Sequence, residues 1–445
     1  MTARRVIEAP PGAGFFAAHT VAGLAAALRD GTATPVDLVE RALADAERLN
    51  PELNAFVTID ADGARAAAKT AADELAAGRD RGPLHGIPVA VKDLVDTAGL
   101  RTTMGSRHFA DHVPRTDAGC VRLLREAGAV VVGKTVTHEF AYGPTGDASA
   151  AGPARNPYRP SAMSGGSSAG SAVAVAAGIV PLAVGTDTGG SVRIPAACCG
   201  IVGLRPTYGA IPADGVFPLS PTLDAVGPIA RTVDDCRLLW HALGAARPAA
   251  GPARIGWVPP ETFHATDEAV TRAARALVPD AADVAVPDGR ELVDDYRLIQ
   301  SSEAYEIHAE RIETAPGLFG EELLARLEMA GQVRGWEYVR ALAHRRRAIA
   351  AIPELFADHD VLALPTVPIT APPVGARQVL AGDSEIEVRP ALLALTSPWS
   401  VLGLPALSVP AGLVDGMPVG LQLVGRPGGE DLLLALAERL QPPVR

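Results

Sequence analysis

The sequence has few aromatic residues, few cysteines and no long apolar run. Phe, Trp and Tyr make up 4% of its 445 residues, although apolar types together reach 48%. The four cysteines, Cys120, Cys198, Cys199 and Cys236, are too few and too irregularly spaced for a disulfide framework or a paired zinc-ligand motif. No segment reaches the roughly 18 apolar residues of a membrane span, and the first residues lack the apolar core of a secretory leader. We therefore expect a cytoplasmic globular protein with no membrane partner.

An excess of positive charge is also absent. Lys and Arg number 40 against 51 Asp and Glu, which leaves a net charge of −11 at pH 7. Nucleic acids and anionic membranes bind basic surfaces, because the protein's cations replace the counterions of the phosphates. The charge therefore argues against nucleic acid as a partner.

Composition divides the chain into four regions. Residues 1–80 read as helices, with Thr20 and Thr34 at positions expected for N-caps. Residues 81–240 alternate short β runs with helices between glycine-rich loops, and 241–355 are charged and helical, which predicts a variable cap-like insertion. Strand patterns return in 356–445, which we assign to the same α/β domain. The alternation predicts an α/β fold in which a large mixed, mainly parallel central sheet carries helices on both faces.

Two short motifs match known patterns in the wrong structural context. Residues 128–135 satisfy the P-loop pattern, but their Ala-Val-Val-Val stretch is typical of a β-strand whose amides belong to a sheet. Residues 166–170 match the nucleophile elbow of α/β-hydrolases around Ser168. The residues before them carry two prolines, however, and predict a surface loop where that fold needs a strand. Neither nucleotide hydrolysis nor an α/β-hydrolase site is favoured.

Three separated segments carry residues suited to a serine–lysine site. Lys92 ends a β run, where apolar neighbours favour the neutral amine and so allow it to act as a base. Ser167 lies in a loop so poor in side chains that the backbone can bend sharply, and its hydroxyl can relay a proton. Ser191 follows two glycines, which leave successive amides free to hold the oxygen of an attacked carbonyl. The sequence thus predicts a nucleophile with an adjoining oxyanion hole.

A Ser-His-Asp triad is the alternative arrangement. The chain has ten histidines, including His85 near the lysine strand and His138 before Glu139, but no spacing places one against a serine. Lysine replaces histidine in some triads where its pKa is lowered. We therefore favour the set Lys92, Ser167 and Ser191.

These segments resemble the amidase signature family. Its hallmark is a Gly-Gly-Ser-Ser-Gly-Gly-Ser loop followed by Gly-Thr-Asp-x-Gly-Gly-Ser-x-Arg-x-Pro, and matching stretches occupy 165–171 and 185–195. Further matches at 84–93, 200–209 and 403–410 extend the resemblance over most of the chain outside 241–355. Ala169 stands where the family usually has glycine. Its methyl group removes no reacting group, so we expect it to be tolerated.

The resemblance implies an enzyme that hydrolyses a small-molecule amide through an acyl-enzyme, without a metal or an organic cofactor. It implies Ser191 as the nucleophile, Ser167 after a cis peptide bond as the bridging serine, and Lys92 as the base. At the level of the family it also implies a homodimer. The implied oxyanion hole consists of the backbone amides of Thr188, Gly189, Gly190 and Ser191, and the implied loop supports are Ser168, Asp187 and Arg193.

The substrate is open at this point. Aliphatic, aromatic and urea-like (allophanate- or biuret-like) amides fit the chemistry, as do esters, and we expect the acyl pocket near Tyr142, Met163, Thr396 and Trp399. A second option is the glutaminase component of a tRNA-dependent amidotransferase, which belongs to the same family and works within a complex. Against it, residues 302–308 do not resemble the Ala-Ser-Ser-Asn stretch typical of that component. A non-catalytic scaffold is disfavoured because the lysine and both serines are intact.

Overall fold

An eleven-stranded sheet forms the centre of the molecule. The computed structural model describes residues 8–244, 253–381 and 384–440. The strands of the sheet lie in the order β1-β3-β2-β6-β8-β7-β14-β15-β11-β9-β10. Their bounds are β1 (Phe56–Ile59), β2 (Pro88–Lys92), β3 (Val130–Thr135), β6 (Leu182–Asp187), β7 (Val202–Arg205), β8 (Ala225–Ala230), β9 (Ile255–Trp257), β10 (Ala282–Asp283), β11 (Val361–Pro365), β14 (Ala406–Val414) and β15 (Met417–Gly425).

Parallel pairing is confined to two parts of this sheet. β2 is parallel to β3 and β6, and β9 is parallel to β10 and β11, whereas the other neighbouring pairs are antiparallel. The predicted α/β fold with a large mixed sheet is confirmed, but the expectation of a mainly parallel sheet is wrong. One reason is the hairpin of β14 and β15, whose turn at Asp415 and Gly416 has positive φ at both residues (52° and 77°). Such a two-residue turn joins antiparallel strands directly, with no crossover helix.

Helices cover both faces of the sheet. Thr20 and Thr34 cap the first two helices as predicted, and the Asp37 side chain completes a capping box with Thr34. No helix within the described ranges is long and apolar enough to cross a membrane. The α-helices are α1 (Val21–Asp30), α2 (Pro35–Leu53), α3 (Ala61–Ala76), α4 (Gly119–Glu126), α5 (Ala169–Ala176), α6 (Arg193–Cys198), α7 (Val233–Leu243), α8 (Glu268–Arg275), α9 (Gly289–Thr314), α10 (Glu321–Ala330), α11 (Gly335–Ala350), α12 (Ile352–Leu355), α13 (Val388–Ala394), α14 (Ser397–Val401) and α15 (Glu430–Leu440).

Several strands lie where helix or loop was expected. β1 interrupts the helical first 80 residues and pairs with β3, and β9 and β10 of the 241–355 region extend the central sheet. The residues before Ser167 form a separate two-stranded sheet, β4 (Arg155–Asn156) with β5 (Arg159–Met163). Strands of two to five residues carry too little periodicity to stand out from their surroundings. A second small sheet pairs β12 (Gln378–Ala381) with β13 (Ser384–Glu387).

Both short motifs judged to be out of context belong to other structures. Residues 130–135 form β3, which lies between β1 and β2 in the sheet, and Gly128 follows α4 with a φ of 77°, as expected of a helix C-terminus. Ser168 lies directly before α5, but β5 ahead of it belongs to the separate two-stranded sheet. Residues 248–252, a proline-containing stretch at which the sequence suggests a joint, lie outside the described residues.

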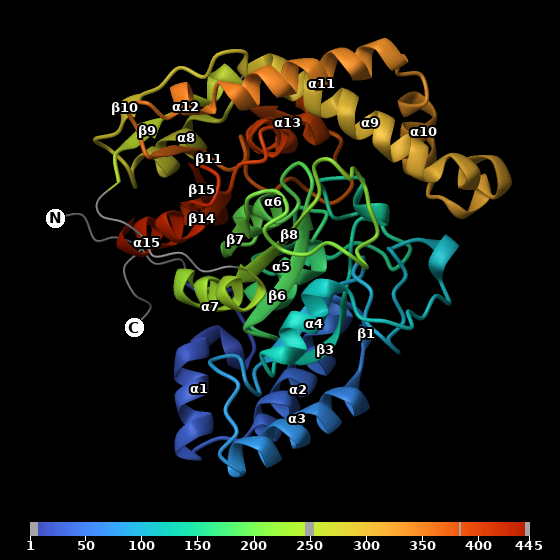
Figure 1. Ribbon diagram of the computed structural model, residues 1–445, viewed down its shortest axis with the longest axis vertical. Coiled ribbons are helices and arrows are strands. Elements are labelled where there is room, and N and C mark those ends of the chain that lie inside the picture. Colours follow the sequence, from blue (N-terminus) through green and yellow to red (C-terminus); the bar gives the residue numbers. More distant parts are fainter. Residues whose placement is uncertain (1–7, 245–252, 382–383, 441–445) are drawn as a thin grey trace.

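Two groups of helices lie at opposite ends of the molecule. Figure 1 shows α1, α2 and α3 at one end of the sheet, and α9, α10 and α11 at the other. Here α9, α10 and α11, together with the turn 315–320 between the first two, are called the cap. A cluster of apolar side chains joins the cap to the core, with Phe319 and Leu323 beside Phe140 and Leu94. The cap therefore covers the edge of the sheet at which Lys92 lies.

We predict that Gly170→Ala destabilises the protein, whereas Ala169→Gly does not do so to the same extent. A Cβ at position 170 would come within 2.2 Å of the Ala55 carbonyl oxygen and 2.4 Å of the Val136 nitrogen, and neither backbone atom can move freely. We expect a loss of about 3 kcal/mol in the free energy of unfolding, at the upper end of overpacking costs. Ala169→Gly, which restores the usual residue of the amidase signature loop, should cost about 1 kcal/mol because glycine is a poorer helix former. Urea denaturation of both variants measures the difference, and equal stabilities would contradict this packing.

Candidate active site

The site lies where two parallel strands end. β2 and β6 are neighbours in register, so their carboxyl ends meet at one edge of the sheet, and ligands of α/β proteins bind beside such edges. Lys92 is the last residue of β2, while Thr186 and Asp187 are the last two of β6. The loops that follow bring the two serines to this edge.

The Lys92 amine is fully buried between hydroxyl groups. Its Nζ atom lies 2.7 Å from Ser167 Oγ and 2.7 Å from Thr186 Oγ1. Burial lowers the pKa of this amine from 10.5 to about 7, because an ammonium ion loses its hydration there, and the Asp224 and Asp187 carboxylates oppose the shift. A sizeable fraction of Lys92 is therefore neutral near pH 7.

Ser167 is held through its backbone by a tight loop. The Gly166–Ser167 peptide bond is cis, as the family resemblance implies. The Ser167 carbonyl accepts hydrogen bonds from the backbone of His138 (3.1 Å) and from Thr137 Oγ1 (3.2 Å). Gly146 packs so closely on the loop that a Cβ there would come within 2.3 Å of the Gly165 carbonyl oxygen. The loop therefore fixes the Ser167 hydroxyl against Lys92.

Ser191 lies in a loop whose backbone donors have no acceptor. Within the described ranges, the amides of residues 188–191 donate no hydrogen bond, although buried amides are nearly always paired. The Ser191 side chain is 6% exposed, and its hydroxyl makes no hydrogen bond to a described residue. The Ser168 amide donates to the Ser191 carbonyl at 3.1 Å and so ties this loop to the Ser167 loop. Four consecutive free N–H groups beside an unpaired hydroxyl can donate hydrogen bonds to a negatively charged oxygen.

A buried ion pair anchors this loop at its base. The Arg193 guanidinium binds both oxygens of Asp187, at 2.9 Å and 2.8 Å, and Arg205 contacts the same carboxylate. The remaining Arg193 donors reach Thr396, Gln422 and Ser400, so that all five N–H groups are used. Ser168 Oγ, fully buried, binds the Thr186 backbone at both its N–H and its C=O. Asp187, Arg193 and Ser168 thus hold the loops in place.

The four residues expected near the acyl pocket occupy different environments. The Thr396 hydroxyl donates to the Gly189 carbonyl at 2.6 Å and supports the donor loop. Tyr142 is buried at the cap, with the guanidinium carbons of Arg326 and Arg389 5.4 and 5.5 Å from its ring centre. Met163 and Trp399 are fully buried in an apolar cluster. The structure brings Thr396 to the site, whereas Met163 and Trp399 belong to the core.

Among the described residues, no histidine side chain forms a hydrogen bond with Ser167 or Ser191. His85 is buried beside Glu74, and its pKa is lowered by burial. The His138 ring is buried next to Thr145, where burial lowers its pKa to about 3, and only its backbone touches Ser167. In the same described residues, no group of three or more His, Cys, Asp or Glu side chains is placed to hold a metal ion.

Sequence reasoning missed three residues at this site. Thr186 is the second partner of Lys92, and its place within the matched Gly-Thr-Asp segment was a usable signal. Asp224 accepts a hydrogen bond from Thr188 Oγ1 at 2.6 Å. Tyr296 of the cap packs on Gly189, where a Cβ would lie 2.2 Å from its hydroxyl oxygen. No local pattern marks Asp224 or Tyr296, because both reach the site through tertiary contacts.

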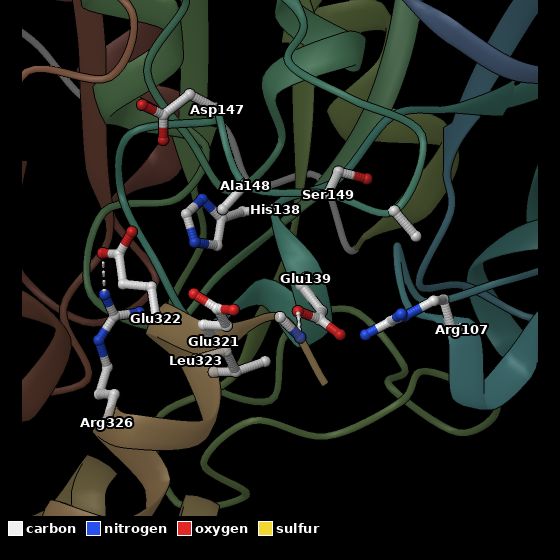
Figure 2. A pocket seen from close by; sticks show the side chains of 12 residues that line it. Arg107, His138, Glu139, Asp147, Ala148, Ser149, Glu321, Glu322, Leu323 and Arg326 are labelled. Carbon is white, nitrogen blue, oxygen red and sulfur yellow. Dashed lines mark hydrogen bonds and ion pairs between the residues drawn. The ribbon is translucent and has the colours of Figure 1, made fainter. Parts of the chain in front are cut away.

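Two cavities lie near the site. Figure 2 shows the larger, of about 270 Å³, between the core loop 138–150 and the start of α10. Most of its charged groups already have partners: Glu322 pairs with Arg326, and Glu139 accepts from Ser106 Oγ and the Gly320 amide. Lys92 and the two serines do not line it. The smaller cavity, of about 10 Å³, is bordered by Thr186, Thr188 and Asp224, and so adjoins the Lys92 partner.

The chain belongs to the amidase family. The sequence pattern of that family matches residues 37–253 and 264–434. The chain is therefore a hydrolase acting on carbon–nitrogen amide bonds, with the amidase signature fold.

Relatives and solved structures are similar over nearly the whole length. The A-subunit of the glutamyl-tRNA(Gln) amidotransferase of Roseiflexus sp. (strain RS-1) is 36% identical over 465 residues, covering 93% of this chain and 94% of that protein. A crystal structure of an amidase is 36% identical, with a TM-score of 0.89 over 94% of this chain and 98% of the other. A structure of a vestigial protein complex that reveals the origins of an s-triazine catabolic enzyme is 32% identical. Its TM-score is 0.91, over 95% of this chain and 98% of that one.

We predict that Asp187→Asn lowers the stability of the protein strongly. The substitution leaves two fully buried guanidinium groups, of Arg193 and Arg205, without their shared negative charge. Breaking a buried ion pair in this way costs about 3–5 kcal/mol of unfolding free energy. Asp73→Asn, which breaks the exposed pair with Lys69, should cause no measurable change. Urea denaturation compares the two variants, and a loss at Asp187 no larger than at Asp73 would contradict the anchoring role.

Proposed function

We propose that this enzyme hydrolyses a small carboxamide through Ser191 as the nucleophile, Ser167 as the bridging serine and Lys92 as the base. The observation that carries the proposal is the buried Lys92 amine, bonded to Ser167 Oγ beside four amides without acceptors. A base of pKa near 7 suits proton transfer at neutral pH, because a sizeable fraction is free to accept a proton and the protonated form can return it. The product is a carboxylate plus ammonia or an amine.

The reaction begins with a proton relay. Neutral Lys92 takes the proton of the Ser167 hydroxyl while Ser167 takes that of Ser191, whose oxygen attacks the amide carbon. The carbonyl oxygen becomes an anion and receives hydrogen bonds from the amides of residues 188–191. The proton returns along the same path to the leaving nitrogen, the carbon–nitrogen bond breaks, and an acyl-enzyme remains on Ser191. Water, deprotonated through the same relay, then releases the carboxylate.

Lys92→Ala should abolish turnover while the protein stays folded. Without the amine the Ser167 hydroxyl has no proton acceptor, so we expect a loss of at least about 10³-fold in kcat/KM. Ammonia release from a panel of primary amides, together with anilide cleavage, measures turnover and reports the preferred substrate class. Lys69→Ala, at an exposed lysine paired with Asp73, is the matched control and should keep full activity.

A fluorophosphonate probe checks the nucleophile in the same preparations. It should label the unmodified enzyme and Ser161→Ala, which changes an exposed serine of β5, but not Ser191→Ala. Undiminished turnover of Lys92→Ala would contradict the assignment of Lys92 as the base. Labelling of Ser191→Ala would contradict the assignment of Ser191 as the nucleophile. Failure of the unmodified enzyme to react would favour a non-catalytic scaffold.

The glutaminase component of a tRNA-dependent amidotransferase is a second candidate. It is favoured by the 36% identity to the Roseiflexus amidotransferase protein, which extends over 93% of this chain. Residues 302–308, which lie on α9, lack the Ala-Ser-Ser-Asn stretch typical of that component. Copurification of the tagged chain with the other amidotransferase components would support this candidate. Full amidase activity of the isolated chain would favour a free-standing enzyme, for which we propose a homodimer.

A urea-type amide is an alternative substrate class, favoured by the likeness to the structure associated with an s-triazine catabolic enzyme. We propose a cytoplasmic location for either candidate.

A further inference from the structure

We infer that Asp224 is a positioning residue for the reaction: it holds the donor loop through Thr188 and supplies the buried negative charge that controls how readily Lys92 binds a proton. The inference rests on the proposed function, in which Lys92 is the base. Asp224 follows a turn of the 219–223 segment and lies outside every motif that drew attention in the sequence.

Asp224 is held rigidly by three donors. Its Oδ1 atom accepts from Thr188 Oγ1 at 2.6 Å, and Oδ2 accepts from the amides of Leu219 (2.9 Å) and Ser220 (3.1 Å). Together the three donors fix both oxygens of the carboxylate. Because Thr188 begins the run of free amides, Asp224 fixes where those amides point.

A small cavity connects Asp224 to the partner of Lys92. The cavity of about 10 Å³ is bordered by Asp224, Thr188 and Thr186, and Thr186 Oγ1 binds Lys92 Nζ at 2.7 Å. It is at the lower limit of the space that one water needs. Apolar side chains, among them Leu94 and Phe217, close its other sides. In so dry a surrounding the field of a carboxylate is screened little.

The charges around Lys92 balance when its amine is neutral and Asp224 is ionised. Asp187 and Arg193 form one buried pair, and Arg205 remains as a second buried cation. The Asp224 charge offsets that of Arg205, and Asp224 makes the largest favourable contribution to protonated Lys92. Burial raises the pKa of Asp224 to about 6, so it is ionised in the range where Lys92 titrates.

The cap also contributes groups that face this cluster. Tyr296 is fully buried, and burial raises its pKa, so it is neutral there. Glu303 of α9 accepts hydrogen bonds from Ser220 Oγ and Thr222 Oγ1, and it also meets the hydroxyl of Tyr338 on α11. Glu303 therefore binds the segment that supplies two of the Asp224 donors. Of the two core carboxylates that favour protonated Lys92, Asp187 is paired with Arg193 and Arg205, and Asp224 has the larger effect.

The test is the pH dependence of kcat/KM. Activity needs neutral Lys92, so kcat/KM of the unmodified enzyme should rise with pH through a midpoint near 7. Asp224→Asn removes the charge that stabilises the ammonium form, so Lys92 loses its proton more readily and the midpoint should move to lower pH by about 0.5–1 unit. A purely structural role would lower kcat and leave the midpoint in place.

Two further variants keep the test decisive. Thr188→Val removes the hydrogen bond that most favours ionised Asp224 but keeps the carboxyl group, so it should shift the midpoint in the same direction by a smaller amount. Asp235→Asn is the matched control, because Asp235 is also buried with its pKa raised to about 6 but binds the Val21 amide away from Lys92. Its midpoint should equal that of the unmodified enzyme.

The outcomes separate this inference from the proposed function. Rates of fluorophosphonate labelling against pH give the same midpoints without a substrate, and they apply to variants with weak turnover. If the unmodified enzyme labels at Ser191 but Asp224→Asn and Thr188→Val leave the midpoint unmoved, the role of Asp224 is wrong and the proposed function stands. If the unmodified enzyme neither labels nor turns over amides, the proposed function fails and this inference fails with it.

Discussion

The burial of one amine governs the organisation of this site. An ammonium ion without water is costly, so a lysine at the end of a buried strand must lose its proton or find a full set of acceptors. Lys92 has two hydroxyl partners, Ser167 and Thr186, and no carboxylate in direct contact among the residues that the structure describes. Hydroxyl oxygens accept from an ammonium and donate to an amine equally well, so both protonation states can be hydrogen-bonded. Hydrogen bonding in both protonation states is what an amine needs if it takes up and returns a proton in each cycle.

The second constraint concerns the loop of residues 188–191, because a run of amides without acceptors does not fix its own backbone conformation. Backbone donors in regular structure are ordered by their acceptors, whereas residues 188–191 have none among the described residues. Order must therefore come from the sides of the loop. Asp187 with Arg193 fixes its base, and the Thr396 hydroxyl fixes the Gly189 carbonyl. A buried, hydrogen-bonded ionic network costs desolvation but favours one arrangement of the loop.

The sequence predicted the α/β fold, and the placing of Lys92 beside Ser167, better than the pairing of the strands. Ser167 and Ser191 stand in segments unusually rich in glycine and serine, and Lys92 ends an apolar β run, so local sequence points to all three. The sequence did not predict β8, which lies between β6 and β7, because Gly227 and Pro228 interrupt its strand pattern. Asp224 and Tyr296 were not predicted, because their roles depend on contacts between distant residues. Asp224 bonds to Thr188, 36 residues before it, and Tyr296 packs on Gly189 from a separate region of the chain. Local patterns carry no information about such contacts.

The two positions before Ser191 are glycine for different physical reasons. Gly190 has a φ of 140°, a conformation that residues with a Cβ rarely adopt, so its identity follows from the turn itself. Gly189 has no such backbone, but a Cβ there would collide with the Tyr296 hydroxyl of α9. Its small size is therefore required by the cap and not by the loop. The cap thus reaches within contact distance of the loop that carries Ser191. Because Tyr296 belongs to the cap and not to the loop, substitutions in the cap can change what packs on Gly189.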